Sequence, residues 1–321
     1  MHSLGVDIGG TKVALGVIDA DGAIIERREY PTPGSPTGID EVIVAAYREL
    51  AERHAIVSMG LAVPGLVSSD RETVMFAPNV NYRNYPIAAR IRTLIDDEVP
   101  VLVENDANAA GWAEYALGAG DGRDMLMLTI GTGVGGAVVL GGQVLRGAHG
   151  AGAEVGHLQI VDGGLTCGCG QQGCFEAYAS GTALERMARE AVGRGSAASA
   201  RLQAIAAVDG AVRGKHVALA AAEGDTLSLD LLDRLGEWIG RGAASLAAVL
   251  DPAVIVIGGG VSTVGDPLFT GIRRGFSRHL TGGENRPVAP IIPAAFGNEA
   301  GILGAADLAR AAANAAPALA R

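Results

Sequence analysis

The sequence predicts an α/β protein with two domains of similar topology. Its length, an alternation of strand and helix patterns, and an internal repeat point to this fold class. At roughly 150 residues per domain, 321 residues fit two domains better than one. Two strand–turn–strand segments begin at Leu4 and Leu126, so each half opens on a glycine hairpin. This repeat predicts two related domains that face each other across a cleft.

The first half reads as three strands followed by alternating helices and strands. Tight turns at Gly9-Gly10 and Asp21-Gly22 separate the opening strands, and a Pro/Gly/Ser linker follows them. We therefore expect a first domain over residues 1–118 with the order βββαβαβα. Its strands are expected at 4–8, 13–19, 23–30, 57–63 and 99–103, and its helices at 39–54, 87–98 and 107–117.

The second half opens on the uncharged run 125–145. This run is long enough to span a membrane, but glycines and threonines in its centre favour a two-stranded hairpin. We expect a second domain over 119–298. It contains a loop-rich insertion (147–180), Ala-rich helices (181–249) and a strand (254–257), and a last helix follows at about 299–315.

Composition excludes several classes of function. The net charge of −10 repels nucleic acids and anionic membranes, and aromatic residues, at 4%, offer no platform for stacking single-stranded nucleic acid. Three closely spaced cysteines do not form a disulfide framework, and no signal peptide pattern is present. We therefore expect a cytoplasmic protein with small-molecule ligands and with no nucleic-acid or membrane partner.

The glycine turns after strands indicate phosphate binding by backbone N–H groups. No Walker A sequence is present. Gly131 to Gly136 fits the dinucleotide pattern G-x-G-x-x-G, but that pattern must open a helix, whereas the residues after it read as a strand. What remains is a strand–turn–strand that lets a triphosphate approach the backbone closely.

Two aspartates are candidates for chemistry. Asp7 lies beside the first glycine turn, where it could hold Mg²⁺ through water; the alternative is a turn aspartate bonded to its own backbone. Asp106 lies at a strand-to-helix junction, where it could act as a general base; the alternative is a helix N-cap. The neighbouring Glu104, Asn105 and Asn108 exceed what one cap requires, which favours the base.

His157 and the segment Cys167-Gly-Cys169-Gly-Gln-Gln-Gly-Cys174 form a Cys₃His set. Such a set fits a tetrahedral structural zinc ion with no open position; three buried free cysteines are the alternative. Glu154 and Glu176 flank the set, so folding around the ion would bring two hydrogen-bond acceptors for a sugar together.

These motifs resemble those of the ROK family (repressors, open reading frames and kinases) over essentially the whole chain. Asp7-Ile-Gly-Gly-Thr-Lys12 and Ile130-Gly-Thr-Gly133 resemble the family's two phosphate motifs. Glu154-Val-Gly-His157 resembles its E-x-G-H motif, and residues 167–176 resemble its zinc motif. The resemblance implies the actin-like ATPase fold, with two ribonuclease H-like domains around a cleft. It also implies that the helix at 299–315 completes the first domain.

The resemblance further implies a glucokinase, which makes glucose 6-phosphate and ADP from glucose and ATP. Asp106 would take the proton of the 6-hydroxyl as that oxygen attacks the γ-phosphate, and His157 would bind zinc with one ring nitrogen and face the sugar with the other. The implied sugar-binding residues are Gly65, Asn79, Asn105, Asp106, Glu154, His157 and Glu176. The implied nucleotide residues are Asp7, Gly9, Gly10, Thr11, Lys12, Thr132 and Gly133 near the phosphates with Mg²⁺, and Gly258, Gly259 and Gly260 near the adenosine.

Several alternatives stay open. Mannose, fructose, N-acetylglucosamine and N-acetylmannosamine present similar hydroxyls, and polyphosphate is an alternative donor. A sugar-sensing regulator of the family would carry a DNA-binding module, for which a first motif beginning at residue 4 leaves no room. An actin-like motor would have no use for the cluster of Glu154, His157 and Glu176. The resemblance suggests a homodimer, with a homotetramer as the alternative.

Overall fold

The computed structural model describes residues 1–95, 98–195 and 197–315, which form two compact units. Unit 1 comprises Met1–Asp124, Ala137–Ala153 and the described residues from Ala294 onward, and unit 2 comprises Met125–Gly136 and Glu154–Pro293.

The units differ from the expected domains mainly in Ala137–Ala153, which was expected in the second domain and falls in unit 1. Contacts with the rest of unit 1 accompany this assignment: Arg146 in this segment forms an ion pair with the buried carboxylate of Glu104 at 2.7 Å, and a Cβ on Gly150 would lie 1.9 Å from the Val67 carbonyl oxygen. As limits of independently folding domains, 1–118 with 299–315 and 119–298 stay a prediction.

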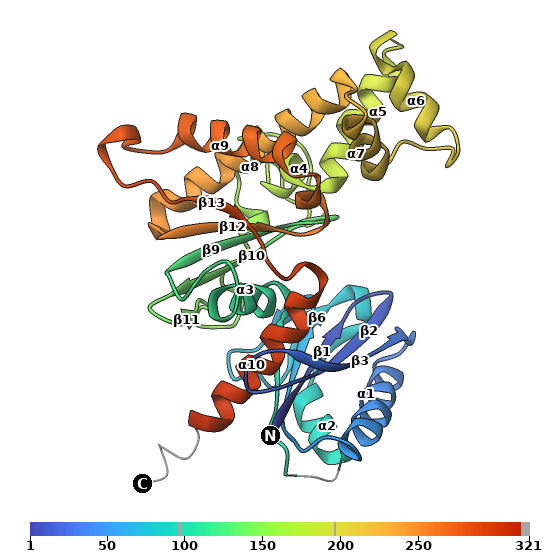
Figure 1. Cartoon of the computed structure of the whole chain (residues 1–321), viewed down its shortest axis with the longest axis vertical. Coiled ribbons are helices and arrows are strands. Elements are labelled where there is room, and N and C mark those ends of the chain that lie inside the picture. Colours follow the sequence, from blue (N-terminus) through green and yellow to red (C-terminus); the bar gives the residue numbers. More distant parts are fainter. Residues whose placement is uncertain (96–97, 196, 316–321) are drawn as a thin grey trace. The chain divides into compact units, whose positions relative to one another are not determined.

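Unit 1 is built on a five-stranded sheet with the order β3-β2-β1-β4-β8 (Figure 1). β2 runs antiparallel to β1 and β3, whereas β1, β4 and β8 are parallel. Because side chains alternate along a strand, Leu4, Val6 and Ile8 enter one core while Gly5 and Asp7 face the opposite side. The strands are β1 (His2–Ile8), β2 (Lys12–Ile18), β3 (Ile24–Pro31), β4 (Ile56–Val63) and β8 (Val101–Asn105).

Helices cover both faces of this sheet (Figure 1). Helices α1 (Pro36–Ala51) and α2 (Ile87–Ile95) pack on one face, over the larger hydrophobic core. Helices α3 (Asp106–Ala116) and α10 (Ala300–Ala315) pack on the other. The helix expected over 87–98 ends at Ile95, and residues 96–97 of that range lie outside the described residues.

Helix α10 lies in backbone contact with the sheet and with α3. A Cβ atom added to Gly5 would lie 2.0 Å from the carbonyl oxygen of Ile302, and one added to Gly60 would lie 1.9 Å from that of Ala305. Contacts this short leave no room for a side chain, so glycines on β1 and β4 let the last helix complete unit 1.

We expect Gly60→Ala to lower the free energy of unfolding by about 3 kcal/mol, because the added methyl group must push α10 away from the sheet. Urea unfolding at equilibrium measures this change. Gly34→Ala is the control, since a Cβ at Gly34 would meet no atom within 4 Å. Equal effects of the two substitutions would contradict the packing argument.

A small three-stranded sheet, with the order β5-β6-β7, is a feature that the sequence patterns did not predict. Its strands are too short to show an alternating pattern. The sheet positions Gly65, just before its first strand, and Asn79 in the turn between its last two. The elements are β5 (Leu66–Val67), β6 (Val74–Ala77), the 3₁₀ turn η1 (Pro78–Val80) and β7 (Tyr82–Tyr85).

The second five-stranded sheet has the order β11-β10-β9-β12-β13, and the unit boundary runs through β10. The run 125–145 forms a hairpin, as expected, and β11 extends it. Among the described residues, no helix has both the length and the apolar character to cross a membrane. The strands are β9 (Met125–Ile130), β10 (Val134–Leu140), β11 (Gln143–Val144), β12 (Val254–Gly258) and β13 (Ile291–Pro293).

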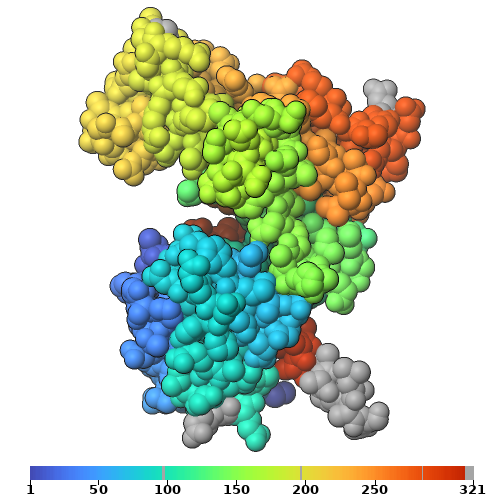
Figure 2. Space-filling model, turned by 180° about the vertical axis from the view of Figure 1, so that it is seen from behind, coloured from blue at the N-terminus to red at the C-terminus, as the bar shows by residue number. Residues whose placement is uncertain are grey.

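The remaining elements of unit 2 are mostly helical. Figure 2 shows the cysteine-containing segment (yellow-green) at the surface of unit 2, between the yellow segment of α6 and α7 and the orange segment of α9. The helices are α4 (Glu176–Ala179), α5 (Gly181–Gly193), α6 (Ala200–Ala206), α7 (Gly214–Ala222), α8 (Thr226–Leu250) and α9 (Asp266–His279). The 3₁₀ turns are η2 (Val155–His157), η3 (Ala197–Ser199), η4 (Gly260–Val264) and η5 (Gly283–Asn285), and η6 (Gly297–Glu299) precedes α10 in unit 1.

Candidate active site

Asp106 is the first residue of α3 and follows β8 directly. The helix is capped by Asn105, whose side-chain oxygen accepts a hydrogen bond from the Asn108 amide at 3.0 Å. Asp106 Oδ1 accepts one from the Ala107 amide at 2.8 Å. Burial raises the pKa of Asp106 above its ordinary value. Because its neighbour supplies the cap, the Asp106 carboxylate is available for a different role.

Asp7 and Asp106 form an acidic pair within unit 1. Burial, together with the charge of Asp106, raises the pKa of Asp7 to about 6. The Asp7 carboxyl carbon lies 3.2 Å from the position of a Cβ on Gly301, in the first turn of α10, where the helix dipole favours negative charge. Two neighbouring carboxylates repel each other unless a cation lies between them. The pair therefore offers the oxygen ligands that Mg²⁺ prefers, directly or through water.

We expect Asp7→Asn to stabilise the protein when Mg²⁺ and nucleotide are absent. The Asp7 carboxyl group has a pKa of about 6 in the folded protein and 3.8 in the unfolded chain. The folded protein therefore binds this proton more tightly, and the stability that the proton contributes is lost as the pH rises through 6. The substitution should raise the free energy of unfolding by up to about 3 kcal/mol at pH 8 and by almost nothing near pH 3. Urea unfolding across this pH range measures the effect, and a gain independent of pH would contradict the cause given.

Glu104 holds the residues around Asp106 in place. Its side chain is 2% exposed. Its Oε1 accepts hydrogen bonds from the Asn105 amide and the Asn108 side chain, both at 3.2 Å. Its Oε2 contacts Arg146 at 2.7 Å and Arg71 at 3.3 Å. Two guanidinium groups thus balance one buried carboxylate, and sequence reasoning missed both arginines because they lie far from Glu104 along the chain.

Gly65 and Asn105, two of the expected sugar-binding residues, lie together in unit 1. The Asn105 side chain donates a hydrogen bond to the Gly65 carbonyl at 3.0 Å. Gly65 has a φ of 130°, and a Cβ there would lie 2.3 Å from the Phe76 carbonyl oxygen, so glycine is required. A third expected residue, Asn79, is exposed and borders the first hairpin, with its carbonyl oxygen 3.6 Å from a Cβ built on Gly10.

The first expected phosphate loop, Gly9-Gly10-Thr11, joins β1 to β2, and the Gly9 amide donates to the Lys12 carbonyl at 2.9 Å. The Lys12 ammonium group forms an ion pair with Glu29 on β3 at 3.1 Å.

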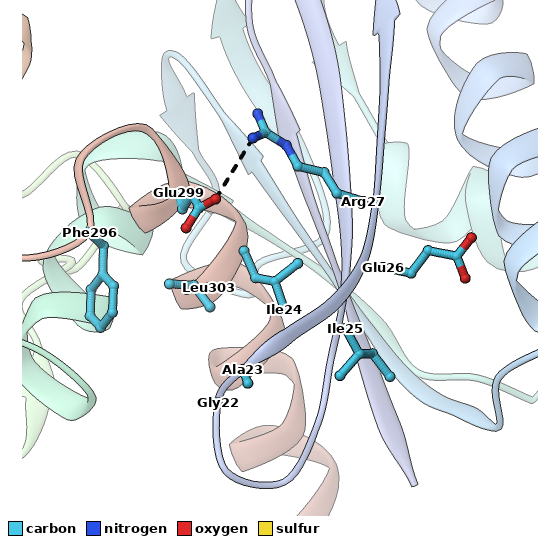
Figure 3. A pocket seen from close by; sticks show the side chains of 9 residues that line it. All are labelled: Gly22, Ala23, Ile24, Ile25, Glu26, Arg27, Phe296, Glu299 and Leu303. Atoms are coloured by element: carbon cyan, nitrogen blue, oxygen red, sulfur yellow. Dashed lines mark ion pairs between the residues drawn. The ribbon is translucent and has the colours of Figure 1, made fainter.

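Glu29 also pairs with Arg27 at 3.1 Å, and Arg27 reaches Glu299 at 3.8 Å at the edge of a surface pocket of 480 Å³ (Figure 3). The charges of Lys12 and Arg27 both lower the pKa of Asp7, against its burial. These basic groups therefore lie within electrostatic reach of Asp7.

The second expected phosphate loop, residues 131–133, lies between β9 and β10 and contacts the start of α5. The Thr132 carbonyl accepts a hydrogen bond from the Thr182 hydroxyl at 2.7 Å, and the Gly131 carbonyl accepts one from the Gly181 amide at 2.8 Å. Gly131, Thr132 and Gly260 line a cavity of 850 Å³ that lies entirely within unit 2.

The other expected nucleotide glycines of unit 2 lie in or beside this loop and pack closely against neighbouring atoms. Gly258 ends β12 and is buried, and Gly259, with a φ of 85°, would place a Cβ 2.5 Å from the Ile130 carbonyl oxygen. A Cβ on Gly133 would lie 2.2 Å from the Glu176 carboxylate. These close approaches set the path of the backbone beside the cavity.

Helices α5 and α7 supply cavity residues that sequence reasoning missed. Leu184 and Glu185 come from α5; Lys215 and Leu219 come from α7, and Arg213 directly precedes it. Leu219 is a large apolar side chain that is 55% exposed. Apolar walls with a few charged groups suit a heterocycle that carries phosphates. No motif marks these residues, and the basic pair Arg213 and Lys215 is the only sequence signal.

The structure brings the expected Cys₃His set together within unit 2. One potential ligand atom from each of His157, Cys167, Cys169 and Cys174 lies within 4.8 Å of the others. The sulfurs of Cys169 and Cys174 are 3.7 Å apart, and Cys167 Sγ lies 3.7 Å from His157 Nδ1. Tetrahedral zinc with Zn–S bonds of about 2.3 Å would place two sulfurs about 3.8 Å apart. The set therefore fits zinc, with His157 Nδ1 as the facing nitrogen.

Glu176 links this cysteine cluster to the second phosphate loop. Its Oε2 accepts a hydrogen bond from the Val134 amide at 3.0 Å, and its Oε1 lies 3.7 Å from Cys167 Sγ. Glu154 directly precedes η2, and its carbonyl accepts a hydrogen bond from the His157 amide at 3.1 Å. The unit 2 residues expected to bind sugar thus adjoin both the candidate metal site and the loop.

Comparisons with known proteins find similarity over nearly the whole chain. The family model described as "ROK family" matches residues 3–312. A glucokinase from Streptomyces coelicolor is 44% identical over 313 residues, which cover 96% of this chain and 97% of that protein. An N-acetylmannosamine kinase from Escherichia coli O157:H7 is 35% identical over 97% of this chain and 99% of that protein.

Among solved structures, a ROK family glucokinase from Streptomyces griseus in complex with glucose and AMPPNP aligns with a TM-score of 0.85. It is 43% identical, and the alignment covers 97% of this chain and 100% of that one. The expected actin-like α/β fold with two domains is thereby confirmed. The chain belongs to the ROK family.

Proposed function

We propose that this protein is a glucokinase that transfers the γ-phosphate of ATP to the 6-hydroxyl of glucose. The observation that carries the proposal is the near full-length similarity to a ROK family glucokinase structure in complex with glucose and AMPPNP, at 43% identity. Curated glucokinases at 44% identity support the same activity.

We propose Asp106 as the general base. Phosphoryl transfer passes through a loose transition state, so the protein contributes mainly position and charge. A base is most effective when its pKa approaches the working pH, and burial moves the pKa of Asp106 in that direction. The base would accept the proton of the 6-hydroxyl as that oxygen attacks phosphorus.

Sugar binding is assigned to residues of both units. Gly65, Asn79 and Asn105 of unit 1 and Glu154, His157 and Glu176 of unit 2 would bind the glucose hydroxyls. Support comes from their grouping within each unit: Asn105 holds Gly65, and Glu176 adjoins the Cys₃His set. A zinc ion in that set would fix the His157 ring, whose Nδ1 faces the thiols, and leave Nε2 for the sugar.

Nucleotide binding is assigned to the cavity of unit 2 and to the two glycine loops. The apolar part of the cavity, with Leu184 and Leu219, would hold the adenosine beside Gly260. Thr132 and Gly133 in unit 2, and Gly9, Gly10, Thr11 and Lys12 in unit 1, would surround the phosphates. Asp7 would hold the accompanying Mg²⁺ through water. Its raised pKa in the absence of a cation supports this role.

A role in glycolysis, a cytoplasmic location and a homodimer, or alternatively a homotetramer, accompany this function as predictions from the family resemblance. Sedimentation of the purified protein would test the oligomeric state.

A coupled assay across sugars and phosphate donors tests the function. We expect kcat/KM to be highest for glucose with ATP, compared with mannose, fructose, N-acetylglucosamine and N-acetylmannosamine, and with polyphosphate as donor. Preference for N-acetylmannosamine would instead place the chain with its relatives at 35% identity. ATP hydrolysis independent of any sugar would contradict a kinase function altogether.

A further inference from the structure

The cavity of unit 2 depends on a segment with no regular structure of its own. Residues 207–213 connect α6 to α7 as turns and bends, and the two residues that follow them, Gly214 and Lys215, line the cavity together with Arg213. A mobile connection would leave these lining residues undefined, so specific contacts must fix the start of α7.

His216 and Asp209 provide the first set of contacts. His216 is 3% exposed, and its Nδ1 accepts a hydrogen bond from the Arg213 amide at 3.1 Å, which satisfies a free N–H group at the helix start. A ring nitrogen that accepts carries no proton, so Nε2 is the protonated nitrogen and donates to Asp209 Oδ2 at 3.1 Å. The same oxygen forms an ion pair with Lys215. Hydrogen bonds from Lys215 and His216 lower the pKa of Asp209 and keep it ionised.

Helix α5, which also contributes residues to the cavity, provides the second set. Glu185 Oε1 accepts a hydrogen bond from the Gly214 amide at 3.1 Å, and Arg189 donates to the Val212 carbonyl at 3.2 Å. Glu185 and Arg189 also pair with each other at 2.6 Å. The backbone from Val212 to Gly214 is therefore held by side chains of both α5 and α7.

We infer that Asp209 and His216 are positioning residues for nucleotide binding, acting through Arg213 and Lys215 at the cavity wall. This inference rests on the proposed function, because it takes the cavity to hold the nucleotide of a kinase. Neither residue lines the cavity, so their loss loosens the wall without removing a contact to the ligand. The nucleotide then binds more weakly, while the sugar site and the acidic pair of unit 1 are unaffected.

His216→Phe tests the inference, since it keeps the ring volume and removes both ring hydrogen bonds. We expect KM for ATP and the dissociation constant of ADP to rise about tenfold, as expected from the loss of one or two hydrogen bonds, with kcat and KM for glucose within twofold of wild type. His216→Asn should recover part of the ATP affinity, because its amide oxygen can replace Nδ1 as acceptor for the Arg213 amide. Asp209→Asn keeps an acceptor for Nε2 but removes the charge opposite Lys215, so its effect should be intermediate.

Asp225→Ala is the matched control. Asp225 caps α8, accepting a hydrogen bond from the Ser228 amide at 2.9 Å, and does not line the cavity. Asp225→Ala should lower Tm about as much as His216→Phe does, but it should leave KM for ATP unchanged. If His216→Phe does not fold, Asp209→Asn and His216→Asn carry the test.

The inference is overturned if the wild-type protein is active but KM for ATP stays within twofold in the histidine and aspartate variants. It is also overturned if Asp225→Ala raises this KM equally. A wild-type protein that does not phosphorylate sugar with ATP would instead contradict the proposed function, so the two failures are distinguishable.

Discussion

Asp106→Asn should lower kcat by a factor of about 10² or more, with little change in KM for glucose or ATP. Asparagine has the shape of aspartate and can keep the hydrogen bond from the Ala107 amide, but it cannot accept the proton of the 6-hydroxyl. The helix cap is unaffected because Asn105 supplies it. Steady-state kinetics with saturating glucose and ATP measure the effect.

Thermal stability, measured as Tm, shows whether the Asp106→Asn protein is still folded. Removing the charge at position 106 also removes a repulsion that raises the pKa of Asp7, so Tm at pH 8 should be unchanged or slightly higher. Near-normal turnover would remove Asp106 from the role of base. A large loss of kcat together with a fall in Tm would point to misfolding instead.

Cys169→Ser should lose bound zinc and sugar affinity together. The Cys169 sulfur lies 3.7 Å from that of Cys174, and a hydroxyl is a poor substitute for a thiolate in such a set. Without the ion, the His157 ring and the segment that carries Glu176 lose their anchor, and we expect KM for glucose to rise about tenfold or more. KM for ATP should change less than KM for glucose, because no cavity-lining residue comes from the cysteine segment, which Glu176 links to the phosphate loop.

Elemental analysis of the purified protein and kinetics with both substrates measure these effects. Gln171→Ala is the matched control, since it lies exposed in the same segment and keeps all three thiols. A metal-free Cys169→Ser protein with unchanged KM for glucose would contradict the shaping role of the ion. Zinc retained in the variant would contradict the ligand set.

Much of unit 1 could be predicted from the sequence because its strands and helices carry strong periodic patterns. The expected strand at 57–63 is observed as Ile56–Val63, and the expected helix at 107–117 is observed as Asp106–Ala116. The expected family and fold are confirmed. The small sheet of β5, β6 and β7 was missed because two to four residues are too few to show a period.

The candidate site was predictable where a motif marks it and not elsewhere. Asp7 and Asp106 each belong to a short motif, and the cysteines have a recognisable spacing. Arg146 and Arg71 were not predictable, because only the folded chain brings them to Glu104. The same holds for Arg213 and Lys215, whose place at the cavity is set by contacts with α5 and with the turn before α7.

The glycine contacts of α10 bear on the order in which the protein matures during synthesis. The sheet face that carries Gly5 and Gly60 accepts this helix, which begins only at Ala300 and is therefore made long after the strands. A ribosome must therefore add all of the residues between these strands and α10 before β1 and β4 acquire their final cover. Until then that surface stays open to chaperones or to premature association between nascent chains.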